Sequence, residues 1–547
     1  VTLTDASGQY RLTNVPAGQA SVRAFRTGLP EQVQAVSVAP GGVAQQDFTL
    51  TAGDAPGRPD GTVQLAKFVV NTTTEMDGAA IAINTQRFAP NIVNVVAADE
   101  FGAVASGNVG ELLKTVPGVT IGLGGLGAPF TISLNGVPPN NVPVTIGGFN
   151  LANAANGTQR TVGMHQISIN NMARIEVSYT PTPESSGAAL AGSVNLVPRS
   201  AFERSKPVFN YTVSLVLRDS ARHLGKSAGS LREPVRTVNP SVDVAAIVPV
   251  NSRFGFTVSA STFQAYIPQA FAQSTWRGAS AATNGNTLPD TTPDRPYLTD
   301  YAVRDGSALQ QRSTFGATAD FKLTRNDRIS FSFQYGRYYD QSANQMLSFF
   351  ANRVAPGSFT LTSTQGFTGA GEMRMTNNAF KWEDSLYMPS LTYRHDGPIW
   401  KAEIATGLSR SDRNRSDLAN GYFNNVQAHR QGVTVAFDDI VYLGPRVISI
   451  TDGPTGAPID PSDIDTYGLS TANSNPLNAS DLQRNVFANL RRDFATRVPL
   501  TLKAGLDVRQ SIRDVRTDMV PFTFVGADGR AGTGDDSAAI VYDSVRS

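Results

Sequence analysis

The chain has 547 residues, enough for three or four domains of roughly 150 residues each. Its 46 Lys and Arg nearly balance 45 Asp and Glu, so the net charge of +1 gives no electrostatic reason to expect nucleic acid as a partner. The absence of cysteine excludes disulfide frameworks, thiolate zinc sites and cysteine nucleophiles. Charged residues make up only 17%, and 49 Gly and 32 Pro favour strands, turns and loops, so we expect a mainly β protein.

The sequence contains no stretch of about eighteen consecutive apolar residues, which excludes transmembrane helices. Its first residues, VTLTDASGQY, have neither the charged start nor the apolar core of a secretion signal. Because these residues already have the pattern of a strand, we expect the first strands of this domain to be missing and the sequence to be a fragment.

Residues 1–50 consist of short alternating runs separated by Gly and Pro, which predicts a small antiparallel β-sandwich. The pattern D-x-x-G-x-Y-x-L followed by VPAG resembles the carboxypeptidase-regulatory-like domain, a non-catalytic β-sandwich. The residues that carry this resemblance are Asp5, Gly8, Tyr10, Leu12 and Val15 to Gly18. We expect an N-truncated domain of this kind over residues 1–50.

Residues 51–75 are expected to form a linker, because 51–62 are rich in Gly, Pro and Asp and have no apolar periodicity. A short β-prone segment follows at 63–70 and includes Phe68, Val69 and Val70. This segment is either a strand of the next domain or a docking peptide that adds an edge strand to a partner.

Residues 76–203 read as a compact α+β domain. A helix is predicted within 106–118, because Val109, Leu112, Leu113 and Val116 form one apolar stripe. Asn108 can cap this helix, and a Pro-Gly pair at 117–118 ends it. Strands are predicted at 130–136, 142–148, 173–179 and 192–198.

From about residue 208 the sequence alternates strictly between apolar and small or polar residues. In RISFSFQYGRYY (328–339), Ile329, Phe331, Phe333 and Tyr335 share one face, and the residues between them are Ser, Gln and Gly. Similar segments recur up to 498–509. Each predicts a strand with one apolar face and one polar face.

The connections between these strands alternate between short and long. Short ones are expected at Val250–Ser252, Thr324–Asp327, Asp396–Pro398 and Ala495–Arg497. Between them lie connections of about twenty, forty-five, forty-five and seventy residues, which are uncommon in compact soluble domains. Together with strands of about ten to twelve residues, this alternation is typical of a membrane β-barrel. We expect residues 204–547 to hold about nine strands of a C-truncated barrel, because bacterial barrels close with an even number.

Three stretches resemble the plug domain of TonB-dependent outer-membrane receptors: NVGELLKTVPGV (108–119), VTIGGFNL (144–151) and MARIEVSYTPTPESSGAALAGSVNLVPRS (172–200). The positions of the plug motif are occupied by Pro117, Gly118, Asn135, Gly136, Gly147, Gly148, Arg174, Ile175, Glu176, Val177, Gly187, Gly192 and Asn195. The chain departs from the family where I-R-G, D-G and R-G-P have become LNG, IGG and YTP. Two charged partners are therefore absent, which places in question a contact of plug with barrel through those positions.

The resemblance implies an outer-membrane receptor that imports a scarce solute of the siderophore, cobalamin or oligosaccharide class. Its implied partners are outer-membrane lipid and a TonB-type energy-transducing protein, for which Phe68, Val69 and Val70 are the candidate contacts. The plug and the N-terminal domain would then lie on the periplasmic side. The fold class that follows is a small β-sandwich fragment, an α+β plug domain and the first strands of a transmembrane antiparallel β-barrel.

No pattern of residues indicates catalysis or a cofactor. Gly122, Gly124 and Gly127 have G-x-G-x-x-G spacing, but they follow a helix end and lead into a β-prone segment, which argues against a dinucleotide site. No G-x-S-x-G, H-E-x-x-H or Walker sequence occurs, so we expect that the protein is not an enzyme.

No metal site is expected either. The four histidines, His165, His223, His395 and His429, are far apart in sequence and are expected to be structural. The oxygen donors Asp528, Asp535 and Asp536 lack the D-x-D-x-D-G order of a calcium loop and are expected to lie in a solvated loop.

Aromatic residues near the strand ends, namely Tyr338, Tyr339, Phe349 and Phe350, are expected to form an interfacial girdle rather than to stack on a ligand. The alternative from another class is a soluble or surface-attached β-sandwich binding or adhesion protein. In that case the apolar faces would pack against a second sheet instead of lipid.

Overall fold

The computed structural model describes residues 9–13, 15–24, 32–49, 78–98, 106–124, 127–154, 161–189, 191–226, 234–278, 288–442, 444–494, 500–523, 525 and 529–530. The chain divides into two compact units, Val1–Asn71 and Thr72–Ser547. Phe68, Val69 and Val70, expected as partner contacts, lie outside the described residues, as do Asp528, Asp535 and Asp536.

The described part of the first unit contains one antiparallel pair of strands, β1 (Gly18–Ala24) and β2 (Gln32–Val38). Exposed and half-buried residues alternate along both strands, as expected for a sheet with one face covered. Tyr10 contributes to that cover: its hydroxyl donates a hydrogen bond to the Gln46 carbonyl at 2.6 Å, and its ring lies 6.2 Å from that of Phe48.

The second unit begins with an α+β domain, residues 78–203. Its elements are α1 (Gly78–Arg87), β3 (Val93–Ala97), α2 (Val109–Leu113), β4 (Val119–Leu123), β5 (Pro129–Leu134), η2 (Pro139–Asn141), β6 (Val144–Ile146), β7 (Phe149–Asn150), η3 (Met164–Gln166), η4 (Ile169–Asn171), β8 (Met172–Ser178), β9 (Ser193–Pro198) and η5 (Ala201–Glu203). Five strands form a sheet in the order β3-β8-β9-β6-β7, in which β6 and β9 are parallel, while β4 and β5 form a separate hairpin.

Helix α2 confirms the helix predicted from the apolar stripe. The Asn108 side chain accepts a hydrogen bond from the Gly110 amide at 2.8 Å, which caps the first turn. The stripe residues are buried in the core of the domain, and the chain turns away at Gly118, whose φ is +73°. The hairpin of β4 and β5 also places Gly122 inside a strand, so the G-x-G-x-x-G spacing here does not open a helix.

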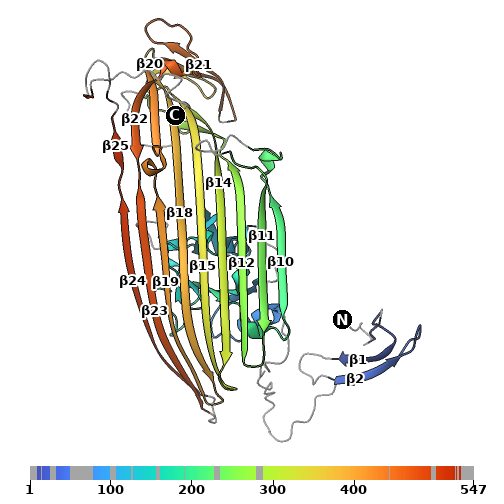
Figure 1. The fold of residues 1–547 in the computed structure, drawn as a ribbon. Coiled ribbons are helices and arrows are strands. Elements are labelled where there is room, and N and C mark those ends of the chain that lie inside the picture. The colour runs from blue at the N-terminus through green and yellow to red at the C-terminus, as the bar shows by residue number, and fades with distance from the viewer. Residues whose placement is uncertain are drawn as a thin grey trace. The chain divides into compact units, whose positions relative to one another are not determined.

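The second unit continues as one large antiparallel sheet (Figure 1). Nine strands follow one another in the order β10 (Val208–Val216), β11 (Asn239–Pro249), β12 (Phe254–Pro268), β14 (Tyr297–Lys322), β15 (Asp327–Phe350), β18 (Gly371–Asp396), β19 (Trp400–Arg415), β23 (Leu477–Phe494) and β24 (Leu500–Thr517). The expectation of a mainly β fold is confirmed. Among the described residues, no helix is long and apolar enough to cross a membrane.

Several strands are much longer than the ten to twelve residues expected. β14 and β18 have 26 residues each, and β15 has 24. The pairing of β15 with β18 runs unbroken from Asp327 opposite His395 to Phe350 opposite Glu372, so the connection between them is only residues 351–370. The predicted strand lengths were too short, because strand pairing continues into sequence that no longer has an apolar face.

The two faces of the sheet differ in polarity. On one face, large apolar side chains such as Phe331, Ile404 and Leu490 are exposed, and we call this the outward face. On the opposite, inward face, polar residues such as Gln334 and Ser409 are buried. A soluble sheet packs its apolar face and exposes its polar one, and here the arrangement is reversed.

The apolar stretch of the outward face has a definite height. On β19 the outward residues from Trp400 to Leu408 are Trp, Ala, Ile, Thr and Leu, and the ion pair of Arg410 with Asp412 follows them. On β15 and β18, the ring of Tyr335 lies 5.1 Å from that of Tyr387, and Arg337 then pairs with Glu383 at 2.6 Å. This apolar belt has the length of about 9–11 residues that a tilted strand needs to cross a bilayer.

Strands from the long connections form an apical region above the belt. They are β13 (Phe271–Arg277), β16 (Val354–Phe359), β17 (Thr364–Gly366), β20 (Asn425–Val441), β21 (Gly444–Asp452), β22 (Gly468–Ser474) and β25 (Val520–Phe522), with η6 (Asp219–Ala221), η7 (Leu418–Asn420) and η8 (Ile464–Thr466) between other strands. A second hydrophobic core holds this region together and contains Phe349, Met373, Val435, Phe437 and Tyr467.

The expected aromatic girdle is therefore wrong for three of the four residues, namely Phe349, Tyr338 and Phe350. Phe349 is buried in the apical core, because the strands continue past the belt. Tyr338 lies on the inward face, because it is an odd number of residues from Tyr335 and its neighbours on the outward face. Phe350 also lies above the belt, where the guanidinium of Arg374 is 4.7 Å from its ring.

The exposed apolar belt yields a prediction for the full-length protein in lipid bilayers. We expect Ile404→Arg to lower the free energy of unfolding by about 2–4 kcal/mol, because a charge at mid-belt must leave water for hydrocarbon. Leu361→Arg is the matched control: both side chains are 55% exposed, but Leu361 lies in the apical region. Equal effects of the two substitutions on unfolding in bilayers would show that the belt does not contact lipid.

Candidate functional site

Several motif residues of the α+β domain meet at the turn between β6 and β7. Asn195 on β9 donates to the Glu176 carboxylate at 3.0 Å and accepts hydrogen bonds from the Gly148 amide at 3.0 Å and the Thr145 hydroxyl at 2.9 Å. Arg174 pairs with Glu176 at 2.9 Å on the same face of β8. Gly147 and Gly148 have φ values of +59° and +88°, which allow the tight turn between β6 and β7. These contacts fix where the chain after Phe149 points.

Other motif residues fix the chain near the end of α2 and at the start of β9. Asn135 donates its backbone amide to the Gly118 carbonyl at 2.8 Å, and it takes a left-handed φ of +50° before Gly136. Gly192 is required at its position, because a Cβ there would lie 2.2 Å from the Ser178 carbonyl oxygen. Ile175 and Val177 are fully buried in the core, whereas Gly187 lies in an open loop.

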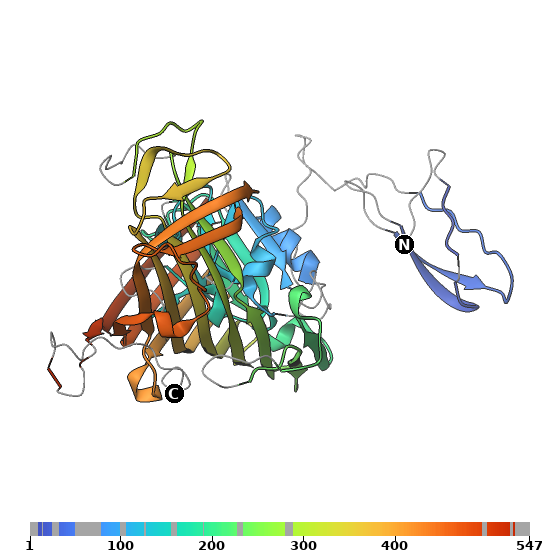
Figure 2. The same cartoon turned by 90° about the horizontal axis from the view of Figure 1, so that it is seen from above.

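The α+β domain lies against the inward face of the large sheet (Figures 1 and 2). Phe149 inserts where β19 has Gly407, since a Cβ at that position would lie 2.6 Å from the ring. Similarly, a Cβ on Gly336 of β15 would lie 2.3 Å from the Gln166 carbonyl oxygen. We call the large sheet, β10 to β24, the wall. Its inward glycines let its backbone approach the α+β domain closely.

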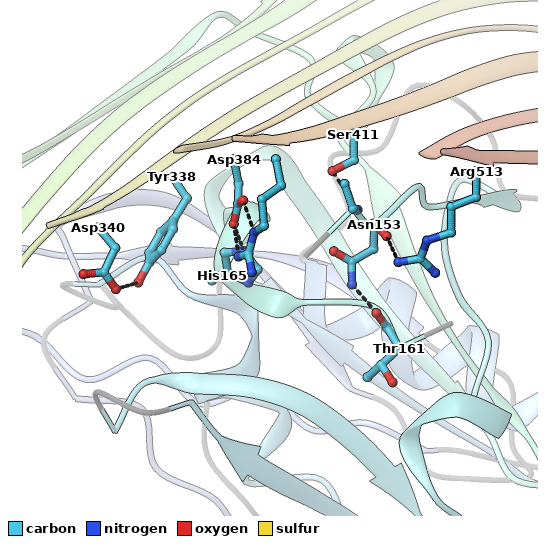
Figure 3. Close-up of polar contacts among 10 residues, drawn as sticks. Asn153, Thr161, His165, Tyr338, Asp340, Asp384, Ser411 and Arg513 are labelled. Atoms are coloured by element: carbon cyan, nitrogen blue, oxygen red, sulfur yellow. Dashed lines mark hydrogen bonds and ion pairs between the residues drawn. The ribbon is translucent and has the colours of Figure 1, made fainter. Parts of the chain in front are cut away.

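The segment after Phe149 is bound to the wall through its backbone (Figure 3). The amides of Ala152, Asn153 and Ala154 donate to Ser409 Oγ at 2.9 Å, to Asp481 Oδ2 at 2.8 Å and to Ser411 Oγ at 3.2 Å. Arg513 donates to the Asn153 carbonyl at 3.0 Å. Strands β19, β23 and β24 therefore supply the side chains that an irregular segment needs to satisfy its buried backbone groups.

A row of inward side chains crosses four neighbouring strands at the same level. Arg312, Tyr338, Asp384 and Arg413 are successive cross-strand partners on β14, β15, β18 and β19. Arg413 bonds to both carboxylate oxygens of Asp384. We call these four residues the polar row.

His165 of η3 meets the polar row from the α+β domain (Figure 3). Its Nε2 lies 2.9 Å from Asp384 Oδ2, and its ring stacks on Phe130 at 4.8 Å and meets the edge of Tyr338 at 4.7 Å. Nδ1 is buried and has no hydrogen-bond partner in the part of the chain that the structure describes. This geometry fits a neutral imidazole that donates from Nε2, because a charged one would bury a second N–H without an acceptor.

Burial lowers the pKa of His165 below 6.5, and this effect outweighs the hydrogen bond and the charge of Asp384, which act in the opposite direction. The charges of Arg413 and Arg312 also favour the neutral ring. The expectation that His165 is structural agrees with these contacts.

A cavity of about 1190 Å³ separates the loop at 183–187 from the inward faces of β15, β18, β19, β23 and β24. Lys503 of β24 forms an ion pair with Glu184 of this loop across the cavity. Both partners are partly exposed, so this contact contributes little to stability.

The polar row, the wall residues that bind 152–154 and the Lys503–Glu184 pair are the contacts that sequence reasoning missed. The chain contains them as scattered Arg, Asp, Ser and Lys residues on separate strands, and no local motif marks them. One signal was present: an inward Gly in an otherwise alternating strand, as at Gly336 or Gly407, indicates that another backbone or a large side chain approaches closely.

Residues 85–194 match the family of the TonB-dependent receptor plug domain, and residues 1–51 match that of the carboxypeptidase regulatory-like domain. No curated protein sequence matches the chain.

Among solved structures, the chain is similar to the ferric enterobactin receptor from Pseudomonas aeruginosa, with 10% identity over 75% of this chain and 63% of that chain and a TM-score of 0.31. It is also similar to the siderophore receptor PiuA from Acinetobacter baumannii, with 12% identity over 77% and 62% and a TM-score of 0.30. The chain thus spans less than two thirds of the length of both. The TM-scores are below 0.5, so these likenesses carry no argument here, and the plug-domain match concerns residues 85–194.

The lowered pKa of His165 predicts that docking of the α+β domain on the wall depends on pH. The docked domain holds the neutral ring, whereas an undocked, hydrated His165 takes up a proton below about pH 6.5. Docking is therefore fully favourable above that pH and weakens as the pH falls toward the lower docked pKa, by at most about 1.4 kcal/mol per unit. We expect the amides of 152–154 to exchange hydrogen faster at pH 5.5 than at 7.5, after correction for the intrinsic rate.

His165→Gln is the control for this measurement, because glutamine cannot take up the proton. Other titratable or charged groups face the same place, namely Asp340, Asp384, Arg413, Arg312 and Tyr338. Subtracting the profile of the His165→Gln protein removes their contribution. An identical pH dependence in both proteins would show that His165 does not link docking to protons.

Proposed function

We propose, from the premise that residues 85–194 of this chain form a TonB-dependent receptor plug domain, that the protein is an outer-membrane transporter which imports a scarce solute by energised movement of its plug. An outer membrane has no nucleotide supply and no potential of its own, so the energy for uptake must arrive through a partner. The plug-domain family consists of transporters rather than enzymes.

One observation carries this proposal: the plug covers the polar face of a long-stranded sheet whose opposite face is apolar and exposed. A wall with lipid on one side and a polar domain on the other is what a plugged β-barrel requires. A soluble adhesion protein would cover the apolar face with a second sheet, and among the described residues no strand packs on that face. A passive porin would leave the polar face to water.

The direction of the strands supports a periplasmic position for the plug. β10 follows the plug directly, and the turns β11–β12, β14–β15 and β18–β19 are short, whereas the connections at their other ends carry the apical region. We place the short turns in the periplasm and the apical region outside the cell, where it would receive the solute.

The proposed partner is a TonB-type protein that pairs with the β-prone segment 63–70. Force applied there acts on the chain before α1 and so on the plug. The plug is bound to the wall mainly by hydrogen bonds and ion pairs, and only a few apolar wall residues join its core. Such contacts can exchange with water, so the plug can move without exposing a large apolar surface.

The solute is proposed to pass along the cavity between the 183–187 loop and the wall after the plug moves. The inward side chains around this cavity include Arg328, Arg394, Lys401, Arg491 and Lys503. The Lys503–Glu184 pair is the weakest of the plug-to-wall contacts by exposure and would separate first. Siderophore, cobalamin and oligosaccharide classes all remain compatible with this route.

Deletion of residues 63–70 from the full-length protein tests the proposal. We expect the variant to insert into the outer membrane but to bind the purified periplasmic domain of the cell's TonB protein at least about tenfold more weakly, because the edge-strand contact is removed. Deletion of residues 53–60, also eight residues long but without β-prone sequence, is the matched control. It should retain binding.

Two outcomes would contradict the proposal. Recovery of the intact protein in aqueous extracts without detergent would remove the transporter interpretation. Unchanged binding of the TonB domain after deletion of 63–70, with insertion intact, would remove this segment as the partner contact.

A further inference from the structure

A small cavity of about 40 Å³ lies between the plug and the wall on the side away from the large cavity. The plug contributes Ser106, Gly107 and Asn170, and the wall contributes inward residues of β10, β11, β12 and β14. Most of the inward wall residues carry hydroxyls: Thr212, Ser214, Ser241 and Ser261. This volume is about three times the minimum that one water molecule needs.

Arg312, at one end of the polar row, is the cation of this cavity. Its side chain is buried, with the residue only 5% exposed, and its Nε has no hydrogen-bond partner within the described ranges. Among the described residues, no carboxylate oxygen lies within ion-pair distance of this guanidinium, in contrast to Arg413, which Asp384 neutralises. The charge of Asp243 acts on Arg312, but no bond joins the two side chains, so the buried guanidinium N–H groups lack a bonded anionic acceptor in the cavity.

Asp243 is the only carboxylate that lines the cavity within the described ranges. The amide of Asn170 donates to one of its oxygens. Asp243 lies on β11, two strands away from β14. Its row of cross-strand partners runs through Ser261 of β12 to Thr314 of β14, which is two residues from Arg312. A carboxylate at this place repels a fully deprotonated anion, but it accepts a hydrogen bond from an anion that still carries a proton.

We propose that this cavity binds a small protonated oxyanion, hydrogen phosphate, between Arg312 and Asp243. The anionic oxygens accept from the Arg312 guanidinium and the hydroxyls, and the remaining P–O–H donates to Asp243. Sulfate has the same size and shape but carries no proton near neutral pH, so the site discriminates against it. The cavity is too small for a larger solute, which sets this site apart from the proposed transport route.

The bound anion connects the plug at Ser106, Gly107 and Asn170 with strands β11, β12 and β14 of the wall. Gly107 lies close to Arg312: a Cβ there would be 3.0 Å from Nη2, and the residue has a φ of +57°. Occupancy therefore stabilises the docked plug. This consequence rests on the proposed function, whereas the binding itself does not.

Thermal unfolding of the full-length protein in detergent at pH 7 tests the site. Inorganic phosphate at 10 mM should raise the unfolding temperature by about 2 °C relative to chloride at equal ionic strength, and sulfate should not. Arg312→Met should abolish the phosphate shift, because it removes the guanidinium to which the anion bonds. Asp243→Asn should allow sulfate to stabilise as well as phosphate does, because an amide donates to a fully deprotonated oxygen.

Arg337→Met is the matched control, since Arg337 is an exposed arginine on the outward face, paired with Glu383. It should leave the phosphate shift unchanged. Equal stabilisation of the wild-type protein by sulfate and phosphate, or a phosphate shift that survives Arg312→Met, would overturn the proposal. A loss of stability of Arg312→Met in chloride that Asp243→Asn restores would instead identify a simple ion pair. None of these results depends on TonB binding, so the proposed function is tested separately.

Discussion

The two faces of the large sheet must meet different surroundings, and the rest of the structure depends on this constraint. Outward residues such as Phe331 and Ile404 are exposed and apolar, whereas inward residues such as Ser409 and Asp384 are polar and buried. A buried polar group without a partner is unfavourable, so whatever covers the inward face must offer hydrogen bonds. The plug does so with an irregular segment, 152–154, whose own backbone amides need acceptors.

This polar contact also bears on the proposed movement of the plug. The apolar core of the plug is closed within itself around α2 and its sheet, with only a few wall residues such as Leu386 and Phe487 added to it. The remaining contacts with the wall are hydrogen bonds, ion pairs and the polar row with His165. Water can replace the partners in such contacts, whereas separating two large apolar surfaces would cost about 25 cal/mol for each Å² exposed.

Much of the plug could be predicted from the sequence because its signals are local. Helix α2 follows from an apolar stripe, an Asn cap and a Pro-Gly end, all within 108–118. The strands around Glu176 and Asn195 follow from alternation, and the glycines at 147 and 148 from the turn between β6 and β7. The wall strands were recognised by alternation but their lengths were wrong, because pairing of β15 with β18 continues beyond the apolar belt.

The sequence by itself determined which elements form and which face of each wall strand is apolar, since these depend on residues close together in the chain. Only the tertiary structure decided which side chains meet. Arg312, Tyr338, Asp384 and Arg413 come together because of the register of four long strands, and a shift of a single residue would turn each of them to the opposite face. His165 joins them from a different domain, more than a hundred residues away in sequence. Register and docking arise from the sum of many contacts along whole strands, so no short motif can encode them.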